Sequence, residues 1–119
     1  MAPELHGLTT HSTSHSSESI NQCAADMWSL GEIVFQMLTK KPAFPQLSQL
    51  ILYTQGSKPF PNSLLRQYGV SSCGQDFVLS AMLLSPDSRL KAIQAWNHEW
   101  IEKYKSLCIA TSARYLDSI

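Results

Sequence analysis

The chain has 119 residues, of which 44% are apolar and 15% are charged, and its nine basic and nine acidic side chains give a net charge of zero. This length suits one domain and is too short for two. The neutral balance argues against a general nucleic-acid binder, which is usually basic, and the apolar content argues against a disordered chain. The charged fraction is below the usual value of about 25%, which suggests a surface that something else covers.

The cysteines and the apolar runs indicate the cellular compartment. Cys23, Cys73 and Cys108 are an odd number, and their spacing fits no zinc ribbon or disulfide framework. We therefore expect reduced, mostly buried thiols in an intracellular protein, either cytoplasmic or nuclear. No secretory signal is visible, and the longest nearly apolar run, residues 77–84, is far shorter than the roughly 20 residues of a membrane span. Neither a membrane nor a nucleic acid is expected as a partner.

Residues 9–19 contain eight serines and threonines and no residue that would build a core. This composition predicts a flexible loop. His6, His11 and His15 lie in or beside it, but no cysteine, aspartate or second ligand pair accompanies them. We expect a solvated loop here rather than a metal site.

The strongest helical signal covers residues 23–39. Its ten apolar positions occupy nearly the whole circumference of the helix. A helix that is apolar on all sides belongs in the centre of a larger protein. Pro42 then ends the segment.

Shorter helices are expected downstream. Residues 47–55, between prolines, predict a short helix that ends at Gly56, and residues 63–68 are either helical or irregular. Apolar spacing predicts further helices over 75–84 and 91–104, with a turn at 85–88. Since no segment alternates with a period of two, the predicted fold class is all-α.

Three separated motifs lie at residues 2–4, 26–31 and 89–101. In this order they resemble the motifs of eukaryotic protein kinases. Ala-Pro-Glu at 2–4 is similar to the motif that closes the activation segment. Asp-Met-Trp-Ser-Leu-Gly at 26–31 resembles the start of the central helix of the C-lobe, αF, and residues 89–101 resemble the closing αH–αI region. The first motif is weak alone, but the second is specific, and Arg-Leu-x-Ala-x-x-Ala is closer to serine/threonine kinases than to tyrosine kinases. The resemblance implies a C-lobe fragment with helices αF to αI over residues 1–104, followed by a tail over 105–119.

The resemblance implies roles for three charged residues. Glu4 would form a buried ion pair with Arg89, which would tie the activation segment to the lobe. Asp26 would accept hydrogen bonds from the backbone of the catalytic loop. The alternatives are an ordinary helix-start residue at Asp26, where a carboxylate suits the helix dipole, and a solvated turn residue at Arg89.

The resemblance also implies packing and docking roles. Trp28 and Gly31 would pack αF, with Gly31 allowing close approach, and Trp100 would anchor the last helix. The predicted helix at 47–55 would correspond to αG, which contacts substrates and regulators in the family. Its possible docking residues are Leu50, Leu52 and Tyr53.

The chain also departs from the family's pattern. The connection between the first two motifs is longer than usual, and its excess is the serine- and threonine-rich stretch. Lys40 stands where a glycine often follows αF, which removes the preferred helix C-cap.

The motifs that the family needs for phosphoryl transfer are missing from this sequence. The reaction requires a Gly-rich loop, a strand lysine, a His-Arg-Asp catalytic loop and an Asp-Phe-Gly metal ligand. The five glycines are isolated, and Asp76-Phe77 is followed by Val78. We therefore expect no catalytic, cofactor-binding or metal-binding residues in this chain, although a complete parent kinase would use ATP and magnesium.

Two functional hypotheses follow. In the first, the chain is a fragment of a serine/threonine kinase whose parent transfers the ATP γ-phosphate to protein substrates, and it is inactive alone because it starts directly before Ala-Pro-Glu. In the second, it is a stand-alone, non-catalytic interaction module built on the docking surface of the C-lobe. In both, missing kinase segments or a protein partner would cover αF, so part of the face formed by Trp28, Ile33, Phe35 and Met37 should be exposed.

Overall fold

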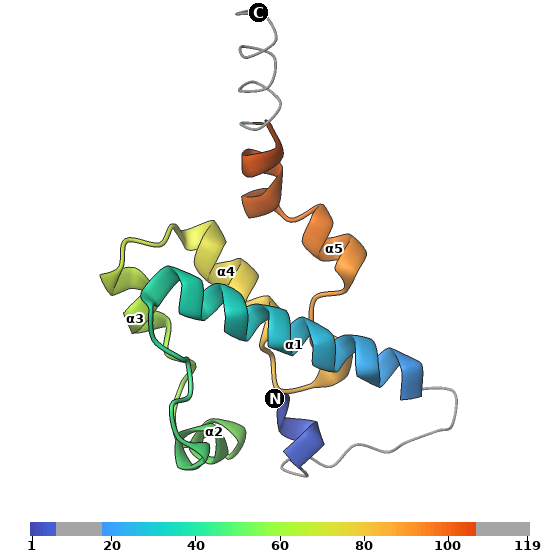
Figure 1. Ribbon diagram of the computed structural model, residues 1–119, viewed down its shortest axis with the longest axis vertical. Helices are drawn as coiled ribbons and strands as arrows, with labels where there is room; N and C mark the ends of the chain where they lie inside the picture. Colours follow the sequence, from blue (N-terminus) through green and yellow to red (C-terminus); the bar gives the residue numbers. More distant parts are fainter. Residues whose placement is uncertain (7–17, 107–119) are drawn as a thin grey trace, which may run out of the picture.

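The computed structural model describes residues 1–6 and 18–106 (Figure 1). The elements in chain order are the 3₁₀ helix η1 (Pro3–His6), α1 (Glu18–Thr39), α2 (Leu47–Thr54), α3 (Asn62–Gln67), α4 (Ser72–Ala81), the 3₁₀ helix η3 (Pro86–Ser88) and α5 (Ala92–Trp96). Residues 99–106 form one more helical stretch. Every regular element of these two ranges is helical, which confirms the predicted all-α class. None of these helices is long and apolar enough to cross a membrane.

The first long helix starts earlier than the sequence pattern predicted. Its expected range was 23–39, whereas α1 begins at Glu18. The loop prediction over 9–19 was therefore wrong at its C-terminal end, and residues 9–17 lie outside the described ranges. No proline or glycine interrupts residues 18–22, so each added residue extends the helix by one more backbone hydrogen bond.

Two predicted helices have different boundaries in the structure. α4 runs over residues 72–81 instead of 75–84. Its earlier start is capped by the Ser71 hydroxyl, which accepts the Gly74 N–H at 3.3 Å. The predicted helix at 91–104 is broken after α5. His98 causes a new helical start, since its Nδ1 accepts the backbone N–H of Trp100 at 3.1 Å. The segment predicted as helical or irregular at 63–68 contains α3, and α2 ends before Gly56, which has a φ of 73°.

An aromatic cluster forms the core on one side of α1, which crosses the centre of the molecule (Figure 1). Trp28 stacks on Phe44, with 6.1 Å between ring centroids, and Phe44 stacks on Tyr53 at 5.2 Å. Phe35 meets the edge of Phe60 at 5.9 Å. These contacts hold α2 and the proline-rich connections around it against α1, because aromatic pairs in such geometries add stability beyond the area that they bury.

Gly31 lets α1 approach the C-terminal end of α4. A Cβ atom at this position would lie 2.5 Å from Met82 Cγ and 3.1 Å from Ala81 Cβ, and both neighbours are fully buried. This close approach is the packing role that the resemblance implied for Gly31.

Replacing Lys40 with glycine should stabilise the protein. Lys40 directly follows α1 and has a φ of 60°. This left-handed region costs a residue with a Cβ about 1–2 kcal/mol, whereas glycine adopts it freely. We expect Lys40→Gly to raise the free energy of unfolding by about 1 kcal/mol, measured by urea denaturation. Lys40→Ala is the matched control, because it removes the charge and keeps the Cβ. An equal gain from both variants would contradict the explanation from backbone strain.

Candidate functional site

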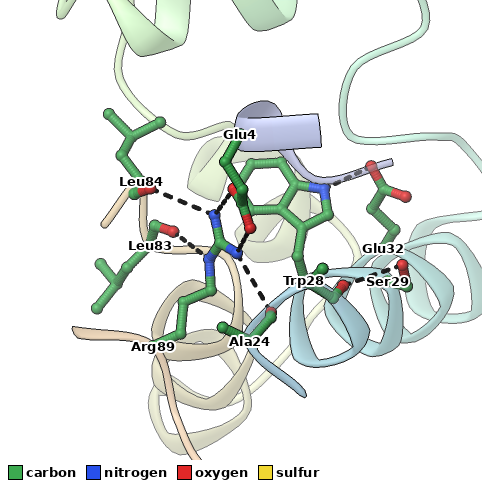
Figure 2. A network of polar contacts seen from close by, with 9 residues as sticks. Glu4, Ala24, Trp28, Ser29, Glu32, Leu83, Leu84 and Arg89 are labelled. Atoms are coloured by element: carbon green, nitrogen blue, oxygen red, sulfur yellow. Dashed lines mark hydrogen bonds and ion pairs between the residues drawn. The ribbon is translucent and has the colours of Figure 1, made fainter. Parts of the chain in front are cut away.

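Arg89 is the centre of the most extensive polar network in the described residues (Figure 2). Its side chain is 0% exposed, and all five of its N–H donors have acceptors. Nε donates to the carbonyl of Leu83 at 2.6 Å, Nη1 to that of Ala24 at 3.2 Å, and Nη2 to that of Leu84 at 3.3 Å. The other two N–H groups bind the two carboxylate oxygens of Glu4, one each. One side chain therefore joins η1, α1 and the segment that follows α4.

The ion pair between Glu4 and Arg89 is the contact that the resemblance implied, and the structure confirms it. It is bidentate, with 2.7 Å between Nη2 and Oε2, and the Glu4 side chain is only 10% exposed. Two parallel charge-assisted bonds fix the orientation of both groups. Arg89 is thus not the solvated turn residue of the alternative interpretation.

Trp28 forms one wall of this network. Its ring centroid lies 5.0 Å from the Arg89 guanidinium carbon, so the cation stacks near an aromatic face. The indole Nε1 donates to Glu32 Oε1 at 2.8 Å, which satisfies the one polar atom of a fully buried side chain. Trp28 therefore connects the Arg89 network to the aromatic core.

Asp26 lies outside the network. It is exposed and has no hydrogen-bond partner in the described part of the chain, so its implied role toward a catalytic loop stays a prediction. It lines an apolar pocket of about 740 Å³ between α1 and residues 86–93, together with Met27 and Ile93. Arg89 also reaches this pocket, but it has no donor left for a ligand.

One face of α1 is uncovered. Leu30, Ile33 and Met37 are 39%, 58% and 75% exposed, and their spacing places them along one side of the helix. The prediction that part of the face formed by Trp28, Ile33, Phe35 and Met37 is exposed is confirmed by Ile33 and Met37. Trp28 and Phe35 are the fully buried part. The reason is the aromatic cluster, whose rings come from segments far along the chain.

Two of the three predicted docking residues belong to the core instead. Leu50 is 5% and Tyr53 8% exposed, and the Tyr53 hydroxyl donates to the Met82 carbonyl at 3.1 Å. Leu50 and Tyr53 are three residues apart and therefore lie on one face of α2. This apolar spacing in the sequence could have identified that face as buried. Leu52 is half-buried, and its docking role stays a prediction.

Trp100 packs the last helical stretch against α4. Its ring lies 5.2 Å from that of Phe77, and a Cβ on Gly74 would come within 3.1 Å of its indole nitrogen. Sequence reasoning missed the neighbouring contact, in which His98 Nε2 lies 2.8 Å from Asp76 Oδ2. Both contacts hold residues 98–106 against α4.

The remaining candidate groups are the histidines and the cysteines, some of which lie outside the described residues. In the described ranges no three histidine, cysteine or acidic side chains gather as metal ligands, and His11 and His15 lie outside those ranges. Cys23 is exposed, contrary to the expectation of mostly buried thiols, and Cys73 is half-buried. Cys108 also lies outside the described residues.

The comparisons with known proteins agree on one family. The family profile described as Protein kinase domain matches residues 1–101. Serine/threonine-protein kinase RAD53 of Saccharomyces cerevisiae is 32% identical over 106 residues, which cover 86% of this chain and 13% of that protein. The probable serine/threonine-protein kinase fhkA of Dictyostelium discoideum is 32% identical over 125 residues, covering 85% of this chain and 20% of the relative. The serine/threonine-protein kinase H1 homolog of Danio rerio is 31% identical over 86 residues, which cover 66% of this chain and 19% of that protein.

The chain thus spans a fifth or less of the length of these relatives. No solved structure matches it.

Removing the charge of Glu4 should destabilise the fold strongly. Glu4→Gln keeps the shape of the side chain but leaves the buried guanidinium without a counter-charge, and breaking one partner of a buried pair costs about 3–5 kcal/mol. We expect the free energy of unfolding to fall by about 3 kcal/mol, the lower end of this range, because three backbone carbonyls still accept hydrogen bonds from Arg89. Urea denaturation measures this loss of stability. The control is Glu102→Gln, which removes one partner of the exposed pair between Glu102 and Lys105. A loss as small as that of the control would contradict a buried, energetically important pair.

Tyr53 should make stability depend on alkaline pH. Burial raises the pKa of Tyr53 above its ordinary 10.0, and the nearby Arg89 charge lowers it only in part. Because the folded state holds the proton more tightly, this stabilisation is complete below pH 10.0 and is lost as the pH rises through the higher folded pKa. Urea unfolding from pH 8 to 11.5 should therefore show a steeper alkaline decline for the unmodified chain than for Tyr53→Phe. Tyr68→Phe controls for the loss of an exposed hydroxyl, and parallel curves for the unmodified chain and Tyr53→Phe would refute the assignment.

Proposed function

Since the chain belongs to the protein kinase domain family, we propose that it is the C-terminal part of the helical lobe of such a domain, from the end of the activation segment to the last helices. In this assignment α1 is the central helix of the lobe, and η1 is the end of the activation segment. The parent protein transfers the γ-phosphate of ATP to serine or threonine of protein substrates, in line with the names of the relatives. This chain supplies the base on which the catalytic segments are held.

The uncovered face of α1 is the observation that carries this proposal. Leu30, Ile33 and Met37 expose large apolar side chains on a helix whose other side is fully buried. Exposed apolar faces of this kind mark surfaces that another element covers. The partner is the rest of a kinase domain or a separate protein that takes its place.

The same uncovered surface continues toward α5. Asp26 lies one helical turn before Leu30 and lines the 740 Å³ pocket, while Ile93 of α5 is 66% exposed at the other side of that pocket. A helix laid across α1 and α5 would fill this space and would bring donors to the Asp26 carboxylate, which has no hydrogen-bond partner among residues 1–6 and 18–106. Residues of the chain that could hold ATP or magnesium are missing, because none of the required motifs is present in the sequence.

The isolated chain should bind no ATP and transfer no phosphate. We expect the melting temperature of the purified 119-residue chain to be the same with and without ATP and magnesium, and no transfer of labelled phosphate to a general protein substrate. Each further 10-fold excess of a ligand over its Kd stabilises a protein by about 1.4 kcal/mol, so binding would be visible in the melt. A reproducible ATP-dependent rise in melting temperature would sink the proposed lack of a nucleotide site.

A second candidate function is a stand-alone, non-catalytic interaction module. The full burial of Trp28 and Phe35 by residues of this chain favours it, because the aromatic core closes without outside help. Denaturation of the monomeric chain distinguishes the two. A cooperative transition above about 4 kcal/mol, near the lower limit for ordinary domains, supports the module. A broad transition without near-ultraviolet circular dichroism supports the fragment.

A further inference from the structure

A second, smaller groove lies between the α1–α2 loop and the connection from α2 to α3, and Phe44 of the aromatic cluster is part of its lining. It has a volume of about 270 Å³. Its apolar lining comes from prolines on both segments and from Phe44 and Leu64, and Lys41 and Lys58 line it as well. This groove shares no lining residue with the larger pocket beside Asp26.

The segments that line this groove carry basic charges and no acidic ones. Residues 33–75 contain four basic side chains and no aspartate or glutamate, although the whole chain is neutral. Lys41 and Lys58 are both exposed, and no acidic side chain of the described residues pairs with either. The groove therefore presents two free cations beside an apolar floor.

The size and stiffness of the groove narrow the class of ligand. Clefts that hold drug-sized molecules and cofactors measure about 300–1,000 Å³. At about 270 Å³ this groove lies at the lower limit of that range and has room for one or two apolar side chains. The prolines fix the backbone of its walls, so little conformational freedom is lost when a ligand is bound.

We propose that this groove, lined by Lys41, Lys58, Phe44, Leu64 and the prolines between residues 42 and 61, binds an acidic peptide segment of a partner protein. One apolar side chain of the peptide packs on Phe44 and Leu64, and flanking carboxylates pair with Lys41 and Lys58. The net neutral charge of the chain argues against a nucleic acid as the ligand, since nucleic-acid binders carry an excess of basic residues. The proposal stands independently of catalysis, because the groove is built by this chain alone.

The test measures the binding of labelled peptides to the full 119-residue chain by fluorescence anisotropy. The probe is a fluorescein-labelled heptapeptide of the composition Glu-Glu-Glu-Leu-Glu-Glu-Glu. Companion probes replace all glutamates with glutamine, all glutamates with lysine, or the leucine with serine, and a single-stranded DNA 12-mer serves as a polyanion without apolar side chains. We expect the acidic heptapeptide to bind best and its affinity to fall with rising salt.

Charge reversal locates the site. Lys41→Glu combined with Lys58→Glu should weaken binding of the acidic peptide at least about tenfold, because rim charges of opposite sign are replaced by repulsive ones. Arg66→Glu is the matched control, since Arg66 lies in the same acid-free segment but not in the groove. Circular dichroism verifies that the variants keep the helical content of the unmodified chain.

Photo-crosslinking gives a second, independent measurement. A benzophenone side chain in place of the peptide leucine should form crosslinks to residues within 42–64, and mass spectrometry identifies the crosslinked residues. Three results would overturn the proposal: equal binding of the acidic and lysine peptides, binding of the DNA at least as tight as that of the peptide, or crosslinks outside this segment. A tenfold loss of affinity for the acidic peptide in Arg66→Glu would also contradict the proposal.

Discussion

The structure depends on a single buried guanidinium group. Arg89 has five donors with fixed directions, and each meets an acceptor from η1, α1 or the segment after α4. A buried charge that lacks any of these acceptors would be costly, so the three segments can fold together but cannot easily separate. Lysine, with one charge centre and three donors, could not replace it. The stacking of Trp28 on the same group extends this constraint into the aromatic core.

The two sides of α1 explain why a small chain shows both a closed core and an open surface. On one side, Trp28 and Phe35 are buried by rings that come from the proline-rich segments. On the other side, the side chains of Ile33 and Met37 are largely exposed to solvent. The buried side forms the core that stabilises the fold of this chain. The exposed side is the surface that, in the proposed function, the rest of a kinase domain covers.

The sequence predicted well what depends on local pattern or on a specific motif. The helical class and the end of α2 shortly before Gly56 were predicted from local residue patterns, whereas the Glu4–Arg89 pair was implied by the resemblance to the kinase motifs. The break after α5 was missed because it depends on the His98 ring capping a new helix start, which residue type alone does not indicate. The sequence did not single out Phe35 as buried, because Phe60, which covers it, lies on a different segment.

The most direct test of the central claim is amide hydrogen exchange on Arg89→Lys, followed by mass spectrometry. This substitution keeps the charge and removes the five-donor geometry. The account predicts faster exchange in three separate places at once, namely η1, the first turns of α1 around Ala24, and residues 82–84, relative to the unmodified chain. If exchange became faster only in η1, or nowhere beyond the immediate neighbours of residue 89, the charge alone would suffice, and the claim that Arg89 joins these segments through its donors would be contradicted.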